Sequence, residues 1–322
     1  MLRVKLIILL TISVLFSGWR EIPSKTAISG KTGFVDNVFS YSEMDWQDSE
    51  ASGSPFFSLK LKKQFFLWED LRIDFWGDIS RYFVVSDFQP IEGGFNLKCN
   101  FDRRAIYFSQ SLKIGNKLRN YSDFDGGFWA LNKSRICEYQ KGATFLKFFD
   151  VIKNLDLSFW KNRYRFNAHF TEFDFDKTDV TADFSKFGIR LRYRFSLGKD
   201  CAQYANGFEK MSDSDFQQYY VSLRYRHKIK LGKATVSCSY LQRDYTSDFH
   251  FEDDPVHSER RNREYGLFLG WTMPFRGMNF SINYSNLQRF VDSPVAWVEE
   301  DKSFAKNKFW VAWEKKWDHF NL

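Results

Sequence analysis

The 322-residue sequence contains no apolar run long enough to form a membrane-spanning helix. Its mean hydropathy of −0.46 also excludes a helical membrane protein. The low content of Pro (6) and Gly (18) excludes collagen-like and low-complexity chains. Aromatic residues are abundant instead, with 37 Phe, 15 Tyr and 11 Trp, which excludes a disordered chain. Either a very wide soluble β-sheet or a transmembrane β-barrel fits this composition.

The N-terminus has the features of a secretory signal peptide. Arg3 and Lys5 precede an apolar stretch at 6–16, which ends in Ser17-Gly18. We therefore predict a signal peptide at 1–18, a short periplasmic lead-in at 19–33 and a membrane domain at 34–322. The alternative for the apolar stretch is a buried N-terminal helix. An exported chain whose basic residues are scattered is not expected to bind nucleic acid.

Beyond residue 33 the dominant period of the sequence is two. Residues 219–231, for example, set Tyr219, Val221, Leu223, Tyr225, Ile229 and Leu231 against Ser222, Arg224, Arg226, Lys228 and Lys230. Such alternation predicts strands with one apolar and one polar face. Several of these strands run for ten or more residues, which exceeds the usual strand of a soluble sandwich and suits a tilted strand in a bilayer.

The connections alternate between short turns and long polar segments. Short links occur at 68–70, 102–104, 232–233 and 276–277, and long ones at 116–142, 198–217, 246–262 and 291–306. Outer-membrane barrels have short periplasmic turns and long outer loops, so the strand number should be even. The predicted strands are 34–46, 55–66, 71–85, 94–101, 105–115, 143–151, 155–161, 164–173, 181–196, 218–231, 234–245, 264–275, 278–290 and 307–318. If Asn162-Arg163 is a bulge rather than a turn, the number becomes twelve.

These features, together with the last strand, resemble Gram-negative outer-membrane β-barrel proteins of the porin-like kind. In the last strand Phe309, Val311, Trp313 and Trp317 alternate with less apolar positions. This resembles the C-terminal assembly signal that the barrel-assembly machinery recognises in that class. The resemblance implies an all-β antiparallel barrel in the cell outer membrane, with lipopolysaccharide and the assembly machinery as partners.

The polar face of the predicted strands is mainly basic. If the apolar face contacts lipid, these basic side chains line the lumen, whereas the acidic ones there are fewer (Asp74, Asp78, Asp156 and Glu314). Charges of one sign in a low-dielectric passage concentrate ions of the opposite sign. The predicted lining residues are Lys60, Lys62, Arg72, Arg165, Arg190, Arg192, Arg194, Arg224 and Arg226. The alternative is that the arginines pair with carboxylates in a plugged structural barrel.

The cysteines and the charged loop at 246–262 are weaker candidates for special sites. Cys137 and Cys201 fall in predicted long outer loops, where a disulfide would tie two loops together, and two free thiols are the alternative. The loop at 246–262 shows no regular ligand spacing, so we predict a solvated charged loop and no metal site. Trp76, Trp160 and Trp310 lie on the polar face, where they would either pack or stack on sugar rings.

The leading functional hypothesis is a passive channel whose basic lumen favours small anionic or polar solutes, without a cofactor. The second hypothesis is a non-conducting barrel whose long outer loops have a structural, adhesive or surface-protein assembly role. The third is a barrel lipid hydrolase centred on His169, which sits beside Thr171 on a polar face. No histidine shows the surroundings of the known barrel phospholipases, so we expect no enzymatic activity.

Overall fold

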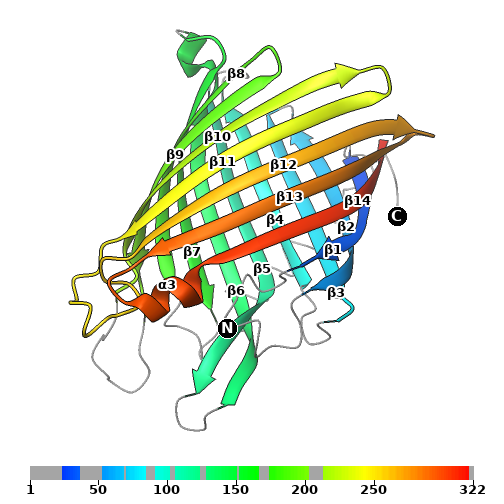
Figure 1. The fold of residues 1–322 in the computed structure, drawn as a ribbon. Helices are drawn as coiled ribbons and strands as arrows, with labels where there is room; N and C mark the ends of the chain where they lie inside the picture. Colours follow the sequence, from blue (N-terminus) through cyan, green and yellow to red (C-terminus); the bar gives the residue numbers. More distant parts are fainter. Residues whose placement is uncertain are drawn as a thin grey trace, which may run out of the picture.

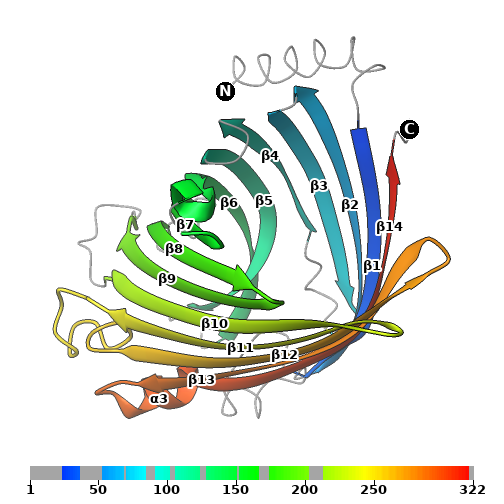
Figure 2. The same ribbon diagram turned by 90° about the horizontal axis from the view of Figure 1, so that it is seen from above.

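The computed structural model describes residues 24–36, 53–68, 70–84, 91–101, 106–123, 128–150, 152–166, 174–202 and 213–318. Fourteen strands form one closed antiparallel barrel (Figures 1 and 2). They are β1 (Ser24–Val35), β2 (Ser54–Trp68), β3 (Leu71–Tyr82), β4 (Ile91–Phe101), β5 (Ile106–Asp123), β6 (Phe128–Phe145), β7 (Leu155–Phe166), β8 (Phe175–Lys186), β9 (Ile189–Asp200), β10 (Phe216–Ile229), β11 (Gly232–Tyr245), β12 (Arg261–Phe275), β13 (Met278–Asp292) and β14 (Phe304–Asp318). A 3₁₀ helix, η1 (Leu146–Asp150), follows β6, and a short helix, α3 (Ala296–Lys302), precedes β14.

Each strand pairs with the next in sequence, and β1 pairs with β14 to close the ring. The seam includes a contact between β14 and Asp36, the residue that follows β1. The Asn307 backbone N–H and side-chain amide each donate to the carboxylate of Asp36 at 2.6 Å. Closure removes the free strand edges, which a lipid environment requires because every backbone polar group must find a partner within the protein.

The distribution of polar and apolar side chains is inverted relative to a water-soluble protein. Large apolar side chains are exposed on the outward face of most strands, as with Leu61 (44%) on β2 and Leu223 (52%) on β10. Buried side chains are mostly polar, and they include Asp74 and Asn162, each 1% exposed. An apolar outer band with a polar interior is the pattern of a barrel that crosses a membrane.

The two ends of the barrel differ in the length of their connections. The end that carries 69–70, 187–188, 230–231 and 276–277 is called the short-turn end. The opposite end carries 246–260 and 293–303, as well as the end of β1 and the start of β2, and is called the long-loop end. The β5–β6 hairpin projects beyond the rest of the barrel at the long-loop end (Figure 1).

The predicted number of fourteen strands is confirmed, although two errors in the predicted strands cancel in the count. One predicted strand is in fact two strands, and two predicted strands are in fact one. The range 181–196 was expected to be one strand, but β8 ends at Lys186 and β9 begins at Ile189. The intervening turn has Phe187 at φ 53° and Gly188 at φ 82°. Positive φ at both central positions defines a type I′ hairpin turn, and Phe is an unusual residue there.

The ranges 155–161 and 164–173 were expected to be two strands, but β7 runs without a break through Asn162-Arg163. The apparent change of phase has a physical origin. The outward face of β7 turns from apolar to basic at Lys161, while the inward face acquires the aromatic residues Tyr164 and Phe166. The alternation of inward and outward positions is therefore preserved although the alternation of polarity is not.

Two further boundaries differ from the prediction. The first strand is Ser24–Val35, not 34–46, so it occupies much of the segment expected to be a lead-in. The polar segment 116–142 was expected to be a loop, but β5 extends to Asp123 and β6 begins at Phe128. The predicted signal peptide at 1–18 lies outside the described residues, as does His169. Within the described ranges, no helix has the length and apolar character needed to cross a membrane.

Candidate functional site: the basic inner wall

The strand register brings five arginines together on the inner wall. Residues paired across antiparallel strands share a face, and Arg190 on β9 lies opposite Arg224 on β10. Every second residue of a strand points inward, so the other members follow at alternate positions of the same two strands. We call Arg190, Arg192, Arg194, Arg224 and Arg226 the arginine cluster.

Asp183 of β8 neutralises part of this cluster. Its carboxylate accepts hydrogen bonds from Arg190 Nε at 2.9 Å and Nη2 at 3.0 Å. It also accepts them from Arg192 Nε at 3.0 Å and Nη2 at 2.9 Å. Two guanidinium groups therefore share one carboxylate, which is itself only 8% exposed. The arrangement holds both arginine side chains in place and leaves an excess of positive charge.

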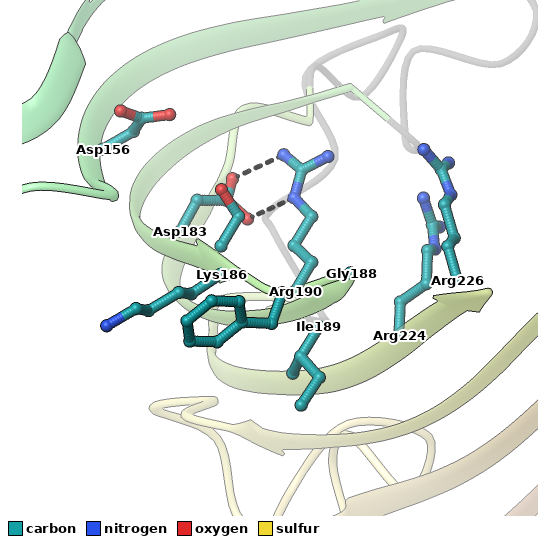
Figure 3. A pocket seen from close by; sticks show the side chains of 10 residues that line it. Asp156, Asp183, Lys186, Gly188, Ile189, Arg190, Arg224 and Arg226 are labelled. Carbon is teal, nitrogen blue, oxygen red and sulfur yellow. Dashed lines mark hydrogen bonds and ion pairs between the residues drawn. The ribbon is translucent and has the colours of Figure 1, made fainter. Parts of the chain in front are cut away.

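The remaining arginines of the cluster have no carboxylate partner in the described part of the chain. Arg194 lies over the ring of Tyr220, with its guanidinium carbon 4.9 Å from the ring centroid. Arg224 and Arg226 lie side by side on β10, across from the Asp183–Arg190 pair (Figure 3).

A cavity of about 450 Å³ lies next to the cluster at the short-turn end. Its lining includes four basic side chains, two carboxylates and the Phe187-Gly188 turn, and the carboxylate of Asp156 faces the Asp183–Arg190 pair (Figure 3). The complete lining is Asp156, Asp183, Ser185, Lys186, Phe187, Gly188, Ile189, Arg190, Arg224 and Arg226. The cavity is therefore open, polar and positive in balance.

A second basic group lies on the wall formed by β2, β3 and β4, around the buried carboxylate of Asp74. Lys62 Nζ is 3.4 Å, Arg72 Nε 2.9 Å and Lys98 Nζ 3.7 Å from its oxygens. Gln64 also donates to this carboxylate at 2.9 Å. One carboxylate with three cations again leaves net positive charge on the inner surface.

Eight of the nine predicted lining residues lie on the inward-facing positions, as the register shows. Lys60 has its Nζ 4.9 Å from the ring centroid of Trp76, Lys62 and Arg72 belong to the Asp74 group, and the other five form the arginine cluster. Arg165 is the exception. It pairs with Cys137 on the outward face of β6–β7 and forms an ion pair with Asp176 at 2.5 Å. Its expected place in the lumen depended on the false break in β7.

The prediction missed inward cations whose alternation was readable. Lys98 follows Asn96 on the polar side of β4, and Lys308 lies on the polar side of β14, 4.2 Å from the ring centroid of Phe56. Trp76, Trp160 and Trp310 do occupy inward positions. Phe309, Val311, Trp313 and Trp317, the predicted assembly signal, form the outward face of β14.

The candidate disulfide is absent from the structure. Cys99, Cys137, Cys201 and Cys238 are all free thiols. Cys137 lies within β6, not in an outer loop, because the expected loop at 116–142 is mostly strand. Cys201 directly follows β9, and its backbone N–H donates to Asp174 O at 2.9 Å.

The charged loop at 246–260 is organised around Asp254, which is 2% exposed. Its carboxylate accepts hydrogen bonds from the backbone N–H of Asp213 at 2.8 Å and from Ser247 Oγ at 3.0 Å, and lies 3.1 Å from His257 Nδ1. Burial alone would raise the pKa of Asp254, but these hydrogen bonds outweigh it and lower that pKa. Asp254 thus ties two long loops together, and the described residues contain no cluster of metal-ligating side chains.

Three comparisons with known proteins were made for this chain. No family model matches the sequence, and no curated protein matches it. The solved structures that it resembles include outer-membrane porins. OccAB4 of Acinetobacter baumannii is 10% identical, with 93% of this chain and 100% of that chain covered and a TM-score of 0.47. OccK3 (OpdO) of Pseudomonas aeruginosa is 10% identical, with 92% and 96% covered and a TM-score of 0.46.

An anion-selective porin from Comamonas acidovorans is also 10% identical, with 92% of this chain and 99% of that chain covered and a TM-score of 0.42. At these identities the likeness concerns the barrel fold alone. The chain is thus a β-barrel similar in fold to outer-membrane porins.

Proposed function

We propose that this barrel is a passive, non-enzymatic channel of the outer membrane that favours small anionic solutes. The observation that carries the proposal is the arginine cluster, in which Arg224 and Arg226 face the interior without a carboxylate partner among the described residues. The short-turn end faces the periplasm and the long-loop end faces the exterior, as in outer-membrane barrels generally.

The accessibility of the inner wall supports conduction. The side chains of Arg190 and Arg192 are 43% and 37% exposed although both are ion-paired, and that of Lys62 is 37% exposed. Side chains that filled a sealed core would be far less accessible. Water and ions can therefore reach the charges that face the interior.

Selection follows from electrostatics. The low-dielectric wall confines the field of the arginine cluster to the passage, so anions are concentrated and cations are depleted there. The cluster binds no single anion tightly, because its exposed guanidinium groups remain hydrated. Weak binding of this kind lets an ion leave as readily as it enters, as a passive channel requires.

Planar-bilayer recording of the refolded protein tests the proposal. We expect a stable conductance whose reversal potential in a salt gradient shows anion preference, and loss of that preference in Arg192→Glu/Arg224→Glu. Absence of current from a barrel whose folding is confirmed by heat-modifiable gel mobility would overturn the proposal.

The second candidate function is a non-conducting barrel that acts through its outer loops. The β5–β6 hairpin favours it, since both strands have 18 residues and project beyond the barrel (Figure 1). A hairpin of this length offers two strand edges to a partner. The same recording separates the two functions, because a purely structural barrel gives a folded protein without current.

A further inference from the structure

Two lysines lie directly opposite each other on the outer surface of the barrel. Lys141 on β6 pairs in register with Lys161 on β7, one step above the outward pair of Ala143 and Phe159. Both side chains are exposed, and neither forms an ion pair within the described residues. Like charges at directly opposed positions of a sheet destabilise it. An anion bound between the two lysines would relieve this repulsion.

Two arginines extend the same face of β7. Arg163 and Arg165 lie at the next outward positions after Lys161, and both approach Asp176 of β8, at 3.6 Å and 2.5 Å. Arg165 also donates to the backbone carbonyls of Tyr164 and Phe175, so it is fully engaged. We call Lys141, Lys161, Arg163 and Arg165 the outer basic patch. Asp174 also lies 3.9 Å from Arg165 Nε, so the four basic side chains have two acidic neighbours and the patch keeps a positive excess.

On β7 to β9 the patch lies at the edge of the apolar outward face. Lys161 pairs with Thr178 of β8, which in turn pairs with Leu197 of β9. The next outward residue of β9 toward the long-loop end is Lys199. On β7 itself the outward residues below Lys161 are Phe159 and Leu157. On β7 the patch therefore begins where the outward face stops being apolar, on the side of the long-loop end, whereas on the other side of the patch Tyr139 of β6 and Leu112 and Ile114 of β5 continue the apolar face. Phosphate groups of membrane lipids lie at that level.

We propose that the outer basic patch binds a phosphate group of lipopolysaccharide in the outer leaflet. Lys141 and Lys161 would hold one phosphate between them and Arg163 would contact its edge. The Cβ atoms of directly opposed residues lie about 5 Å apart, so two lysine ammonium groups can converge on one phosphate. The proposal rests on the outer-membrane placement proposed above, but it does not depend on conduction.

Native mass spectrometry of the refolded barrel in detergent, titrated with bisphosphorylated lipid A, tests this site. We expect the wild-type protein to bind lipid A, and Lys141→Gln/Lys161→Gln to bind it at least about tenfold more weakly, since two charge contacts are lost. Dephosphorylated lipid A should bind the wild-type protein as weakly as bisphosphorylated lipid A binds the variant. Raising the salt concentration should weaken only the phosphate-dependent binding.

The matched control is Lys63→Gln/Lys315→Gln, which removes two outward lysines from the half of the barrel nearest the short-turn end. This control should bind lipid A as the wild-type protein does. Equal affinity of the wild-type protein and Lys141→Gln/Lys161→Gln, or of the two forms of lipid A, would overturn the proposal. Equally tight binding of phosphatidylglycerol would overturn the assignment to lipopolysaccharide, and a dimer that only Lys141→Gln/Lys161→Gln dissociates would reassign the patch to contact between copies.

The site and the channel can fail separately. Neither lysine faces the interior, so Lys141→Gln/Lys161→Gln should keep the wild-type current in a planar bilayer. Loss of lipid binding with normal current supports the site, whereas wild-type protein that binds lipid A but carries no current refutes only the channel. Should the double variant fail to fold, Lys161→Gln alone, with half of the pair removed, provides the same comparison.

Discussion

Reversing the charge of Arg224 is expected to weaken anion preference by a calculable amount. Arg224 faces the interior opposite Arg190 and has no carboxylate partner among the described residues. An ion passing about 6 Å from its guanidinium interacts with one unit charge by about 0.7 kcal/mol at the dielectric constant of water. At 0.1 M salt the Debye length is about 10 Å, so screening reduces this to about 0.4 kcal/mol.

Arg224→Glu changes the wall by two units of charge, so an anion loses about 0.8 kcal/mol and a cation gains about as much. The anion-to-cation permeability ratio should then fall roughly tenfold at 0.1 M salt. At 1 M salt, where the Debye length is about 3 Å, the same substitution should change the ratio by only about twofold. Arg224→Gln should give an intermediate ratio at either concentration.

The assay is the reversal potential of single channels in a KCl gradient, measured near 0.1 M and near 1 M. Lys315→Glu is the control, since it makes the same charge change on the outward face of β14. An unaltered ratio in folded Arg224→Glu at low salt would refute the reasoning. So would an effect of equal size at both salt concentrations, or an equal shift in Lys315→Glu.

Three further outcomes are expected. Gly188→Ala should lower the free energy of unfolding by about 1–2 kcal/mol, because Gly188 has φ 82° and a Cβ would meet the carbonyl of Arg226. Denaturant titration followed by tryptophan fluorescence checks this, and a midpoint no lower than that of Gly77→Ala, where a Cβ has room, would contradict it. The pKa of Asp254 is lowered in the folded protein, so its stabilising effect should be complete above about pH 4 and lost as the pH falls through the lowered value. Hydrogen exchange of 246–260, measured relative to an unstructured peptide, should therefore accelerate at acid pH in the wild-type protein. In Asp254→Ala it should be fast at every pH, and a protected loop in that variant would refute the idea that Asp254 holds the two loops together. Thiol titration of the denatured, non-reduced protein should find 4 thiols, and a count of two would show a disulfide instead.

The fold was largely predictable because lipid imposes a simple rule on every strand. Outward positions must be apolar within the band, so the alternation at 218–231 and 278–290 identified β10 and β13 nearly to the residue. The rule fails outside the band. There the outward positions of β7 carry Lys161 and Arg163, and the polarity pattern reads as a break where the backbone has none.

The side chains of the inner wall were predictable, but their pairing was not. The alternation of the sequence assigned Arg190 and Arg192 to the polar face, but it did not identify Asp183 as their ion-pair partner. Because 181–196 was interpreted as one strand, Asp183 was placed on the same strand as these arginines and could not face them. The Phe187-Gly188 turn folds β8 back along β9, which sets Asp183 opposite Arg192. Gly188 was the available signal for that turn, but Phe187 before it masked the signal.

The seam between β1 and β14 determines when the barrel can be completed. Val35 pairs with Lys308 and Lys25 with Asp318, so β1 can find its second partner only after nearly the entire chain has been made. Closing a loop of that length costs about 5 kcal/mol of chain entropy, which the chain recovers only when the seam forms. Until then the growing sheet has two unpaired edges that could join another molecule. The chain must therefore be synthesised to its end, and kept from self-association, before it can become a barrel.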